Sequence, residues 1–254
     1  QSFNDKILKK LNRIHTSNDS LNAIKNIKNI FKNFSVDLMF GTPESDVNTV
    51  RKDLEIINKT SPPHISIYNM TVEKKTVFYK LLNNHKIELP EENIILEQYD
   101  TILNEMKKMG YVNYEISNFA REDYHSEHNS NYWTFGDYIG IGAGAHGKIT
   151  RENGTITRTR RSRSPRDYLT GVSQSVKPQQ HEIPKLELPV EFMLNALRLK
   201  SGVPASLFKA HTGLELAVVM PQIEQLVAQG LMSDNRESIA TTDRGFRFLN
   251  DVVA

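Results

Sequence analysis

The feature that most constrains the fold is an alternation of short apolar runs with longer segments of helical periodicity. The apolar runs have the length of buried strands and occupy residues 34–40, 64–71 and 111–117. The other segments place apolar residues at three- and four-residue steps and occupy residues 1–31, 45–57 and 91–109. A strand–helix–strand–helix–strand order is typical of a parallel sheet covered by helices, so the sequence predicts an α/β fold. Functional groups in such folds gather at the carboxyl ends of the strands.

The composition changes near residue 155, which indicates a domain boundary. An arginine-rich stretch is followed by Ser, Gly and Gln, and from about residue 188 the pattern is helical. Three helices, a hairpin-like piece at 231–242 and a final helix resemble a winged-helix module. The sequence thus predicts an α/β region at 1–154, an Arg-rich linker at 155–187 and a small C-terminal helical domain at 188–254.

The winged-helix-like tail lacks the features of a DNA reader. Its candidate recognition helix, residues 216–229, contains Glu224 but no Lys or Arg. A helix in the major groove normally presents basic and amide groups. The formal net charge of +2 gives no further support, so we expect no nucleic-acid partner and a module that docks within the molecule.

The chain contains no cysteine, which excludes disulfides and thiolate-based metal or cluster sites within it. This composition fits a cytoplasmic protein. No apolar run approaches the ~20 residues of a membrane helix, so we expect no transmembrane segment. The chain begins at Gln1 with neither an initiator Met nor a signal-peptide pattern, and we expect a processed protein or a piece of a longer one.

Residues 114–147 combine two histidines, several tyrosines, the only tryptophan and a series of glycines. Imidazole can serve as an axial ligand, aromatic rings can stack, and glycines let the backbone come close, so this mixture suits a flat aromatic ligand or a metal-bearing cofactor. His125, Glu127 and His128 could also form a two-histidine-plus-carboxylate metal site. We do not favour that site, because the segment lacks clear helical periodicity and the side chains need not share a face.

The segment Gly142-Ala-Gly-Ala-His-Gly147 matches the G-x-G-x-x-G pattern of dinucleotide-binding loops. That fingerprint needs a helix after the loop and an acidic residue about 20 positions on. A strand and turn are predicted instead, so we reject a Rossmann site. Two interpretations stay open, a tight crossing between packed layers and a close approach of the backbone to a ligand.

Two further groups of charged residues have structural and functional interpretations. Asp37 lies between Val36 and Leu38 in a predicted buried strand, where it would hold a ligand hydroxyl or amino group, or pair with Arg13. The arginines at 158–166 could bind phosphate or an acidic partner, but a solvated linker is the preferred interpretation.

Several stretches resemble one family, the radical SAM proteins related to oxygen-independent coproporphyrinogen III oxidase. The similar stretches are Gln1-Ser-Phe-Asn-Asp5, Leu11-Asn-Arg-Ile-His15, Val36-Asp-Leu-Met-Phe-Gly-Thr-Pro43, Ile65-Ser-Ile-Tyr-Asn-Met-Thr71, Tyr114-Glu-Ile-Ser-Asn-Phe-Ala120, and much of residues 191–251. The element His128-Asn-Ser-Asn-Tyr-Trp133 resembles the HemW branch in particular, the haem chaperones. The resemblance implies the second half of a partial (β/α) radical SAM barrel plus a C-terminal helical, winged-helix-like domain.

The resemblance also implies roles for particular residues. Gln1, Arg13, Asp37 and, more weakly, Thr71 match positions that contact S-adenosylmethionine. His128 matches the haem-ligand position, and the haem site would extend to a further group of residues, Asn129, Tyr132 and Trp133. The family's cofactors are S-adenosylmethionine and a [4Fe–4S] cluster, and the implied partners are haem, haem-accepting proteins and, in one arrangement, a second copy of the chain.

The chain departs from the family pattern in lacking the C-x-x-x-C-x-x-C loop, so it cannot hold the cluster in the usual way. Thr42 also stands where the family usually has Leu. We therefore expect a C-terminal fragment of a HemW-like protein that binds and delivers haem. The alternatives are coproporphyrinogen III oxidase activity, which the chain alone should not show, and a truncated remnant without function.

Overall fold

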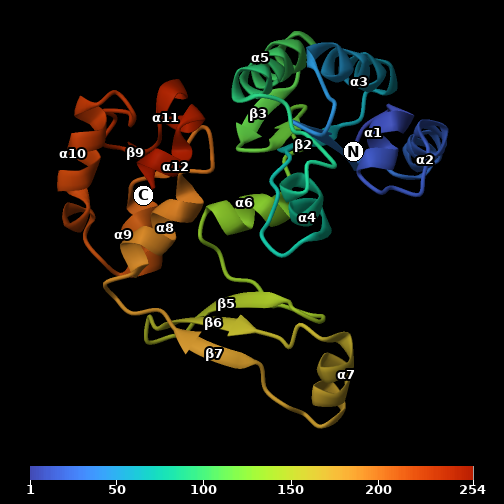
Figure 1. The fold of residues 1–254 in the computed structure, drawn as a ribbon. Helices are drawn as coiled ribbons and strands as arrows, with labels where there is room; N and C mark the ends of the chain where they lie inside the picture. The colour runs from blue at the N-terminus through green and yellow to red at the C-terminus, as the bar shows by residue number, and fades with distance from the viewer. Residues whose placement is uncertain (254) are drawn as a thin grey trace. The chain divides into compact units, whose positions relative to one another are not determined.

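The computed structural model describes residues 1–253, which divide into two compact units, Gln1–His125 and the residues from Ser126 onward (Figure 1). The first unit is a four-stranded sheet with helices. Its elements are α1 (Asp5–Lys10), α2 (Ser17–Ile30), β1 (Ser35–Phe40), α3 (Val47–Thr60), β2 (His64–Asn69), α4 (Val77–Asn83), α5 (Glu92–Lys108), β3 (Val112–Glu115) and β4 (Asn118–Ala120). The α/β class is confirmed, and so is the predicted alternation, with α4 and β4 in addition; the helix predicted over residues 1–31 is two helices, α1 and α2, separated by residues 11–16.

The order of the strands in the first sheet is β1-β2-β4-β3. Strands β1 and β2 pair in parallel as predicted, but β4 pairs antiparallel with both β2 and β3. The prediction of a parallel sheet is therefore wrong at β4. The reason is local: only Ile116 and Ser117 separate β3 from β4, and so short a connection allows only an antiparallel hairpin.

One face of this sheet carries the main hydrophobic core of the unit. Helices α3 and α5 lie side by side on that face (Figure 1). The apolar side chains of β1 and β2 that point to them are Leu38, Phe40, Ile65 and Ile67, and they pack with buried residues of the helices. Because side chains alternate along a strand, the intervening residues of β1 and β2 lie on the opposite face, where most of the polar ones gather.

The second unit contains a three-stranded antiparallel sheet and a group of short helices. Its elements are α6 (Glu127–Trp133), β5 (His146–Thr150), β6 (Ile156–Arg160), α7 (Pro165–Ser173), β7 (Gln179–Glu182), α8 (Leu188–Ala196), β8 (Val203–Pro204), α9 (Ser206–Thr212), the 3-10 helix η1 (Leu216–Val218), α10 (Met220–Ala228), β9 (Ser238–Ile239), α11 (Asp243–Arg247) and α12 (Leu249–Val252). The sheet has the order β5-β6-β7.

The predicted linker at 155–187 contains regular structure, namely β6, α7 and β7. The strands form because Thr and Arg side chains suit a half-exposed sheet, and β6 pairs along its length with β5. Ser164 caps α7 by accepting the Asp167 backbone N–H, and Pro165 occupies the first turn. The interpretation of this stretch as a solvated linker is therefore corrected, while the domain limits at 154 and 187 stay predictions.

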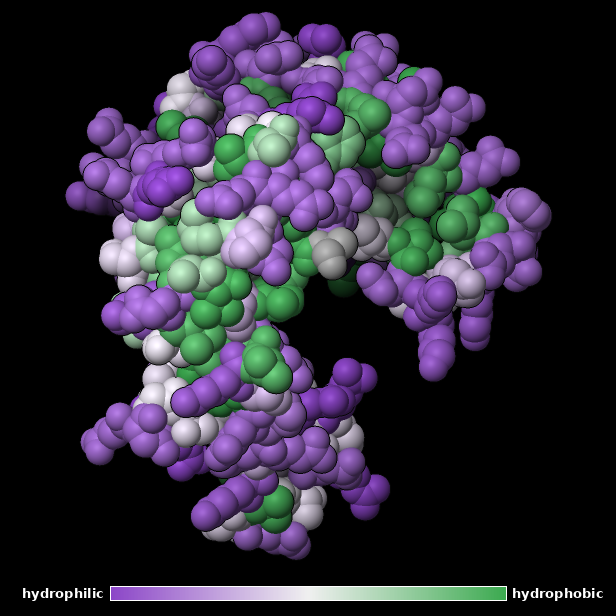
Figure 2. Space-filling model, turned by 90° about the vertical axis from the view of Figure 1, so that its left-hand side faces the viewer, coloured by the Kyte–Doolittle hydropathy of each residue, from purple (hydrophilic) through white to green (hydrophobic). Residues whose placement is uncertain are grey.

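The C-terminal helices follow the order predicted for a winged-helix-like module. Helices α8, α9 and α10 precede a small ribbon, although β9 pairs with β8 as well as forming part of the 231–242 turn. Phe192 and Phe208 are fully buried and pack edge to face with 5.3 Å between ring centroids, which joins α8 to α9. Hydrophobic side chains lie among hydrophilic ones on the face shown in Figure 2.

No helix among residues 1–253 has both the length and the apolar composition that crossing a membrane requires.

Candidate functional site

Helix α6 carries the four residues expected at a haem site. Ser126 begins the helix by accepting the backbone N–H of Asn129 with its hydroxyl, and Thr134 ends it. The sequence showed no clear helical period here, because the apolar face of α6 is made of aromatic and polar side chains rather than aliphatic ones. The helix places His128 and Tyr132 one turn apart on one face, and the same spacing relates Asn129 to Trp133.

The aromatic rings of α6 form a connected group with Tyr138. The His128 ring meets the Tyr132 ring edge to face with 4.7 Å between centroids, and the Tyr132 and Tyr138 rings are 4.2 Å apart. His128 is exposed, whereas Tyr132 and Tyr138 are half-buried. The group therefore offers an accessible imidazole beside aromatic surface, which can both coordinate iron and stack on a flat ring.

Trp133 and Asn129 lie on the neighbouring side of the helix. The Arg198 guanidinium stands over the Trp133 ring, 5.0 Å from its centroid, and the indole Nε1 is buried without a hydrogen-bond partner among the residues that the structure describes. Asn129 is half-buried. The structure thus brings His128 together with Tyr132 and sets Trp133 against Arg198.

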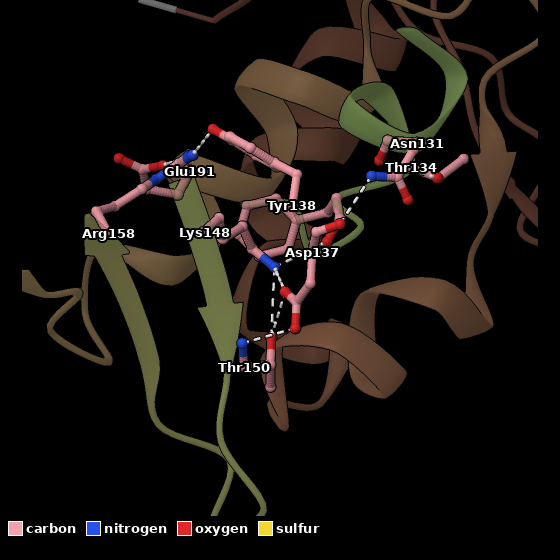
Figure 3. A network of polar contacts seen from close by, with 9 residues as sticks. Asn131, Thr134, Asp137, Tyr138, Lys148, Thr150, Arg158 and Glu191 are labelled. Atoms are coloured by element: carbon pink, nitrogen blue, oxygen red, sulfur yellow. Dashed lines mark hydrogen bonds and ion pairs between the residues drawn. The ribbon is translucent and has the colours of Figure 1, made fainter. Parts of the chain in front are cut away.

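A network of charged groups supports Tyr138 from the sheet side (Figure 3). The Arg158 guanidinium donates to the Tyr138 hydroxyl at 2.8 Å and pairs with Glu191. Lys148, on β5, donates to the Asp137 carboxylate at 2.7 Å and to the Phe135 carbonyl at 2.9 Å. These contacts hold Asp137 and Tyr138 in place, the two residues that follow the turn after α6.

Lys148 is unusual because a lysine rarely lies fully inside a protein, and its side chain is only 1% exposed. Burial lowers its pKa below the ordinary value, although Asp137 favours the charged form. Burial alone would raise the pKa of Asp137, but hydrogen bonds from Lys148 and Thr150 outweigh it and the pKa lies below its ordinary value. The sequence did not predict this pair, because Lys148 stands between Gly147 and Ile149 without a pattern that marks it as buried.

His125 does not share the site geometry of His128. It lies beyond β4 in the first unit, where its ring stacks on Tyr114 with 4.1 Å between centroids. Among residues 1–253 no three His, Cys, Asp or Glu side chains gather in a way that could hold a metal ion. The His125–Glu127–His128 arrangement considered from the sequence is therefore not assembled.

The residues matched to S-adenosylmethionine contacts lie around β1. The Gln1 carbonyl accepts the Met39 backbone N–H at 2.7 Å. The Gln1 side-chain Oε1 is buried without a hydrogen-bond partner among the described residues. Thr71 is exposed just after β2, and no contact joins it to the other three.

Asp37 is exposed on the polar face of β1, so the expectation of a buried carboxylate is wrong at this position. Alternation along β1 turns Val36 and Leu38 to the core and Asp37 away from it. No ion pair joins Asp37 to Arg13 among the described residues, so its carboxylate is accessible. One buried carboxylate of this unit is Asp53, which accepts the Ser2 hydroxyl at 2.7 Å and whose pKa burial raises.

A buried histidine on the same polar face was also missed by sequence analysis. His64 lies between the Ser35 hydroxyl, 2.7 Å from Nδ1, and the Tyr114 hydroxyl, 2.8 Å from Nε2. Burial lowers its pKa, so the neutral imidazole is favoured. The sequence alone did not indicate these contacts of His64, because its partners are 29 and 50 positions away in other strands.

The glycine-rich segment 140–147 makes a tight crossing. A Cβ at Gly140 would stand 2.2 Å from the His146 carbonyl oxygen, and one at Gly147 would stand 2.5 Å from the Thr159 hydroxyl. The segment leads into β5 rather than a helix, in agreement with the rejection of a dinucleotide site. Packing thus explains Gly140 and Gly147, whereas Gly142 and Gly144 have room for a Cβ and are favoured by their positive φ values of +109° and +74°.

Comparison with known proteins finds related sequences along the whole chain. Residues 183–248 match the HemN C-terminal domain. The chain is 36% identical over 254 residues to the haem chaperone HemW of Buchnera aphidicola subsp. Acyrthosiphon pisum, a match that covers 100% of the chain and 65% of the relative. It is 35% identical over 254 residues to the haem chaperone HemW of Escherichia coli K12, with the same two coverages. The chain thus spans 65% of the length of these relatives.

Among solved structures, the fold is similar to that of coproporphyrinogen III oxidase (HemN) from Escherichia coli, a radical SAM enzyme. The TM-score is 0.77 at 16% identity, and the match covers 100% of this chain and 61% of the other. This likeness shows a shared fold. It confirms the predicted α/β architecture.

Proposed function

Because this chain belongs to the family of the HemW haem chaperones, we propose that it takes part in binding haem and delivering it to haem-dependent proteins. The observation that carries the proposal is the placement of His128 on α6. Its imidazole is exposed, and its ring is held against Tyr132. An accessible imidazole next to aromatic rings has the chemistry of an axial haem ligand in a stacking site.

Tyr132 and Tyr138 would hold the porphyrin ring beside His128, and Arg158 and Glu191 would keep Tyr138 in place. Asn129 and Trp133 would complete the site at the adjoining side of α6. In this proposal haem is cargo, so the site needs an exposed ligand that can release it. A histidine on a short surface helix meets that need better than one enclosed in a core.

The cofactors expected of whole radical SAM proteins fit this chain unequally. The chain has no cysteine, so its residues do not fit a [4Fe–4S] cluster that requires thiolate ligands. Gln1, Arg13, Asp37 and Thr71 would contact S-adenosylmethionine, and the unpaired buried Oε1 of Gln1 and the accessible carboxylate of Asp37 suit a ligand with donor groups. When bound beside a cluster, that cofactor supplies radical chemistry. Oxidation of coproporphyrinogen is not favoured for this chain, since the likeness to HemN is one of fold.

Haem titration of the 254-residue chain tests the proposal. We expect the wild-type chain to give a shifted Soret band on saturable binding, and His128→Ala to lose that shift. His125→Ala is the matched control, because it removes an exposed histidine three positions away that stacks on Tyr114 instead. A Soret band that is unchanged in His128→Ala would remove His128 from the site, and an absence of saturable binding in the wild type would overturn the proposed function.

A further inference from the structure

The second unit contains a pocket that no residue of helix α6 lines. It has a volume of about 660 Å³ and is bounded by the end of β6, the first turns of α7 and the start of β7. Four of its lining residues are cationic, Arg160, Arg161, Arg163 and Lys177, and one is acidic, Asp167. The volume lies within the range of sites for small molecules.

The cations of this pocket have no acidic partners among the residues that the structure describes. None of the ion pairs of the molecule includes Arg160, Arg161, Arg163 or Lys177. Arg158, two residues before Arg160 on β6, is by contrast held by Glu191 and Tyr138. The arginine run therefore divides into one structural member and several cations whose charges are left for a ligand or for solvent.

The remaining wall of the pocket is apolar. Val172 and Val176 line it and are 52% and 57% exposed, beside the ring of Tyr168. The Tyr168 hydroxyl accepts the Gly142 backbone N–H at 3.1 Å, which ties the ring to the glycine segment. The side chains around β5–β7 and α7, in the lower part of Figure 2, are otherwise mostly hydrophilic. Exposed valines beside unpaired cations suit a ligand with an apolar body and an anionic edge.

Strand β6 connects this pocket to the aromatic group of α6. Arg158 and Arg160 point to the same side of the strand, because side chains two positions apart share a face. Arg158 contacts Tyr138, and the rings of Tyr138 and Tyr132 lead on to His128. Arg160 therefore lies on the same side of β6 as Arg158, the residue that contacts the aromatic group.

We infer that this pocket is a binding site for the carboxylate edge of a porphyrin, with Arg160, Arg161, Arg163 and Lys177 facing the carboxylates and Val172 and Val176 contacting the apolar rim that bears them. The inference rests on the proposed function and adds a recognition element to it. Guanidinium groups bind carboxylates through paired hydrogen bonds, and the pocket would select porphyrins by their acidic side chains.

Two metal-free porphyrins test this site without involving iron or His128. Fluorescence titration compares protoporphyrin IX, which has two propionates, with its dimethyl ester, which has none. We expect the 254-residue chain to bind the acid more tightly than the ester. Arg163→Gln should weaken binding of the acid about three- to ten-fold and leave binding of the ester unchanged, as for loss of a solvent-facing charge pair.

Arg166→Gln is the matched control. Arg166 lies three residues after Arg163 in the same run but is not among the lining residues, so its loss changes the net charge equally and should leave the affinity for both porphyrins unchanged. Equal affinities of the wild type for acid and ester, equal losses in both variants, or no binding of protoporphyrin would each overturn the inference. His128→Ala should bind protoporphyrin normally, so failure of the haem proposal and failure of this one are separable.

Discussion

The two units each bury a basic side chain beside a sheet, and they satisfy it with different chemistry. In the first unit His64 lies between the hydroxyls of Ser35 and Tyr114. In the second unit Lys148 donates to the Asp137 carboxylate, the Phe135 carbonyl and, at 3.4 Å, the Thr150 hydroxyl. Hydroxyls suit a neutral imidazole, whereas a carboxylate supplies the opposite charge that a buried ammonium requires.

The contrast shows why the two regions should respond differently to substitution. Removing one of the two hydroxyl groups that contact His64 takes away one neutral hydrogen bond, which contributes about 1 kcal/mol to the free energy of unfolding. Removing Asp137 leaves a buried charge without its counter-ion. The second unit should therefore lose more stability on substitution than the first. The residue with the largest effect, Asp137, directly follows the turn after α6.

The largest effect is expected for Asp137→Ala. We expect it to lower the free energy of unfolding by about 2 kcal/mol, because Lys148 would remain buried with neutral partners only, while solvent at the 42% exposed Asp137 already screens part of the attraction. Chemical denaturation of the 254-residue chain, followed through Trp133 fluorescence in the same unit, measures the change. Lys148→Met made together with Asp137→Ala should recover part of the loss, since the double variant no longer buries a charge. Additive losses in the double variant would contradict the pairing.

A smaller effect is expected from titration of His64. Its pKa in the folded state lies below the ordinary value of 6.5, so the unfolded state binds more protons between the two values. The stabilising contribution is complete above pH 6.5 and decreases as the pH falls from there toward the folded-state pKa. Asp137 acts in a separate window, because its stabilising contribution decreases only as the pH falls below 3.8.

Unfolding free energies measured from pH 8 to pH 5 test the His64 contribution alone, because this range stays above the window of Asp137. We expect His64→Gln to flatten the dependence below pH 6.5. His181→Gln is the control, because His181 is exposed on β7 and its removal should leave the slope unchanged. An equal slope in the wild type and in His64→Gln would show that His64 does not cause the dependence.

The sequence predicted most elements of the first unit because their causes are local. Periodic apolar residues predicted α5, and the glycine at its end, Gly110 with φ of +79°, marked its stop. The insertion of β4 between β2 and β3 depends on pairing between distant strands, which periodicity does not encode. The same holds for His64 and Lys148, whose burial is set by partners that meet only after folding. His128 was found from its resemblance to a family motif, and its pairing with Tyr132 required the geometry of α6.

The smallest effect is expected at the Arg158–Glu191 pair, which extends the comparison from buried to half-exposed charges. The two side chains are 29% and 32% exposed, so solvent screens their attraction. We expect Glu191→Gln to lower the free energy of unfolding by about 0.5 kcal/mol in the same denaturation assay. Glu187→Gln is the control and should leave it unchanged, because Glu187, one turn earlier, is exposed and makes no ion pair among the described residues.

If Glu191→Gln instead destabilised the chain as much as Asp137→Ala, the network around Tyr138 would act as one cooperative unit rather than as two independent ion pairs, one with a buried lysine and one with both partners half-exposed. The haem titration would then help to distinguish the two cases. In a cooperative network Glu191→Gln should also alter the Soret band, because Tyr138 would no longer hold Tyr132 beside His128. With independent pairs the band should stay as in the wild type, since the Arg158 hydrogen bond to Tyr138 does not require the carboxylate.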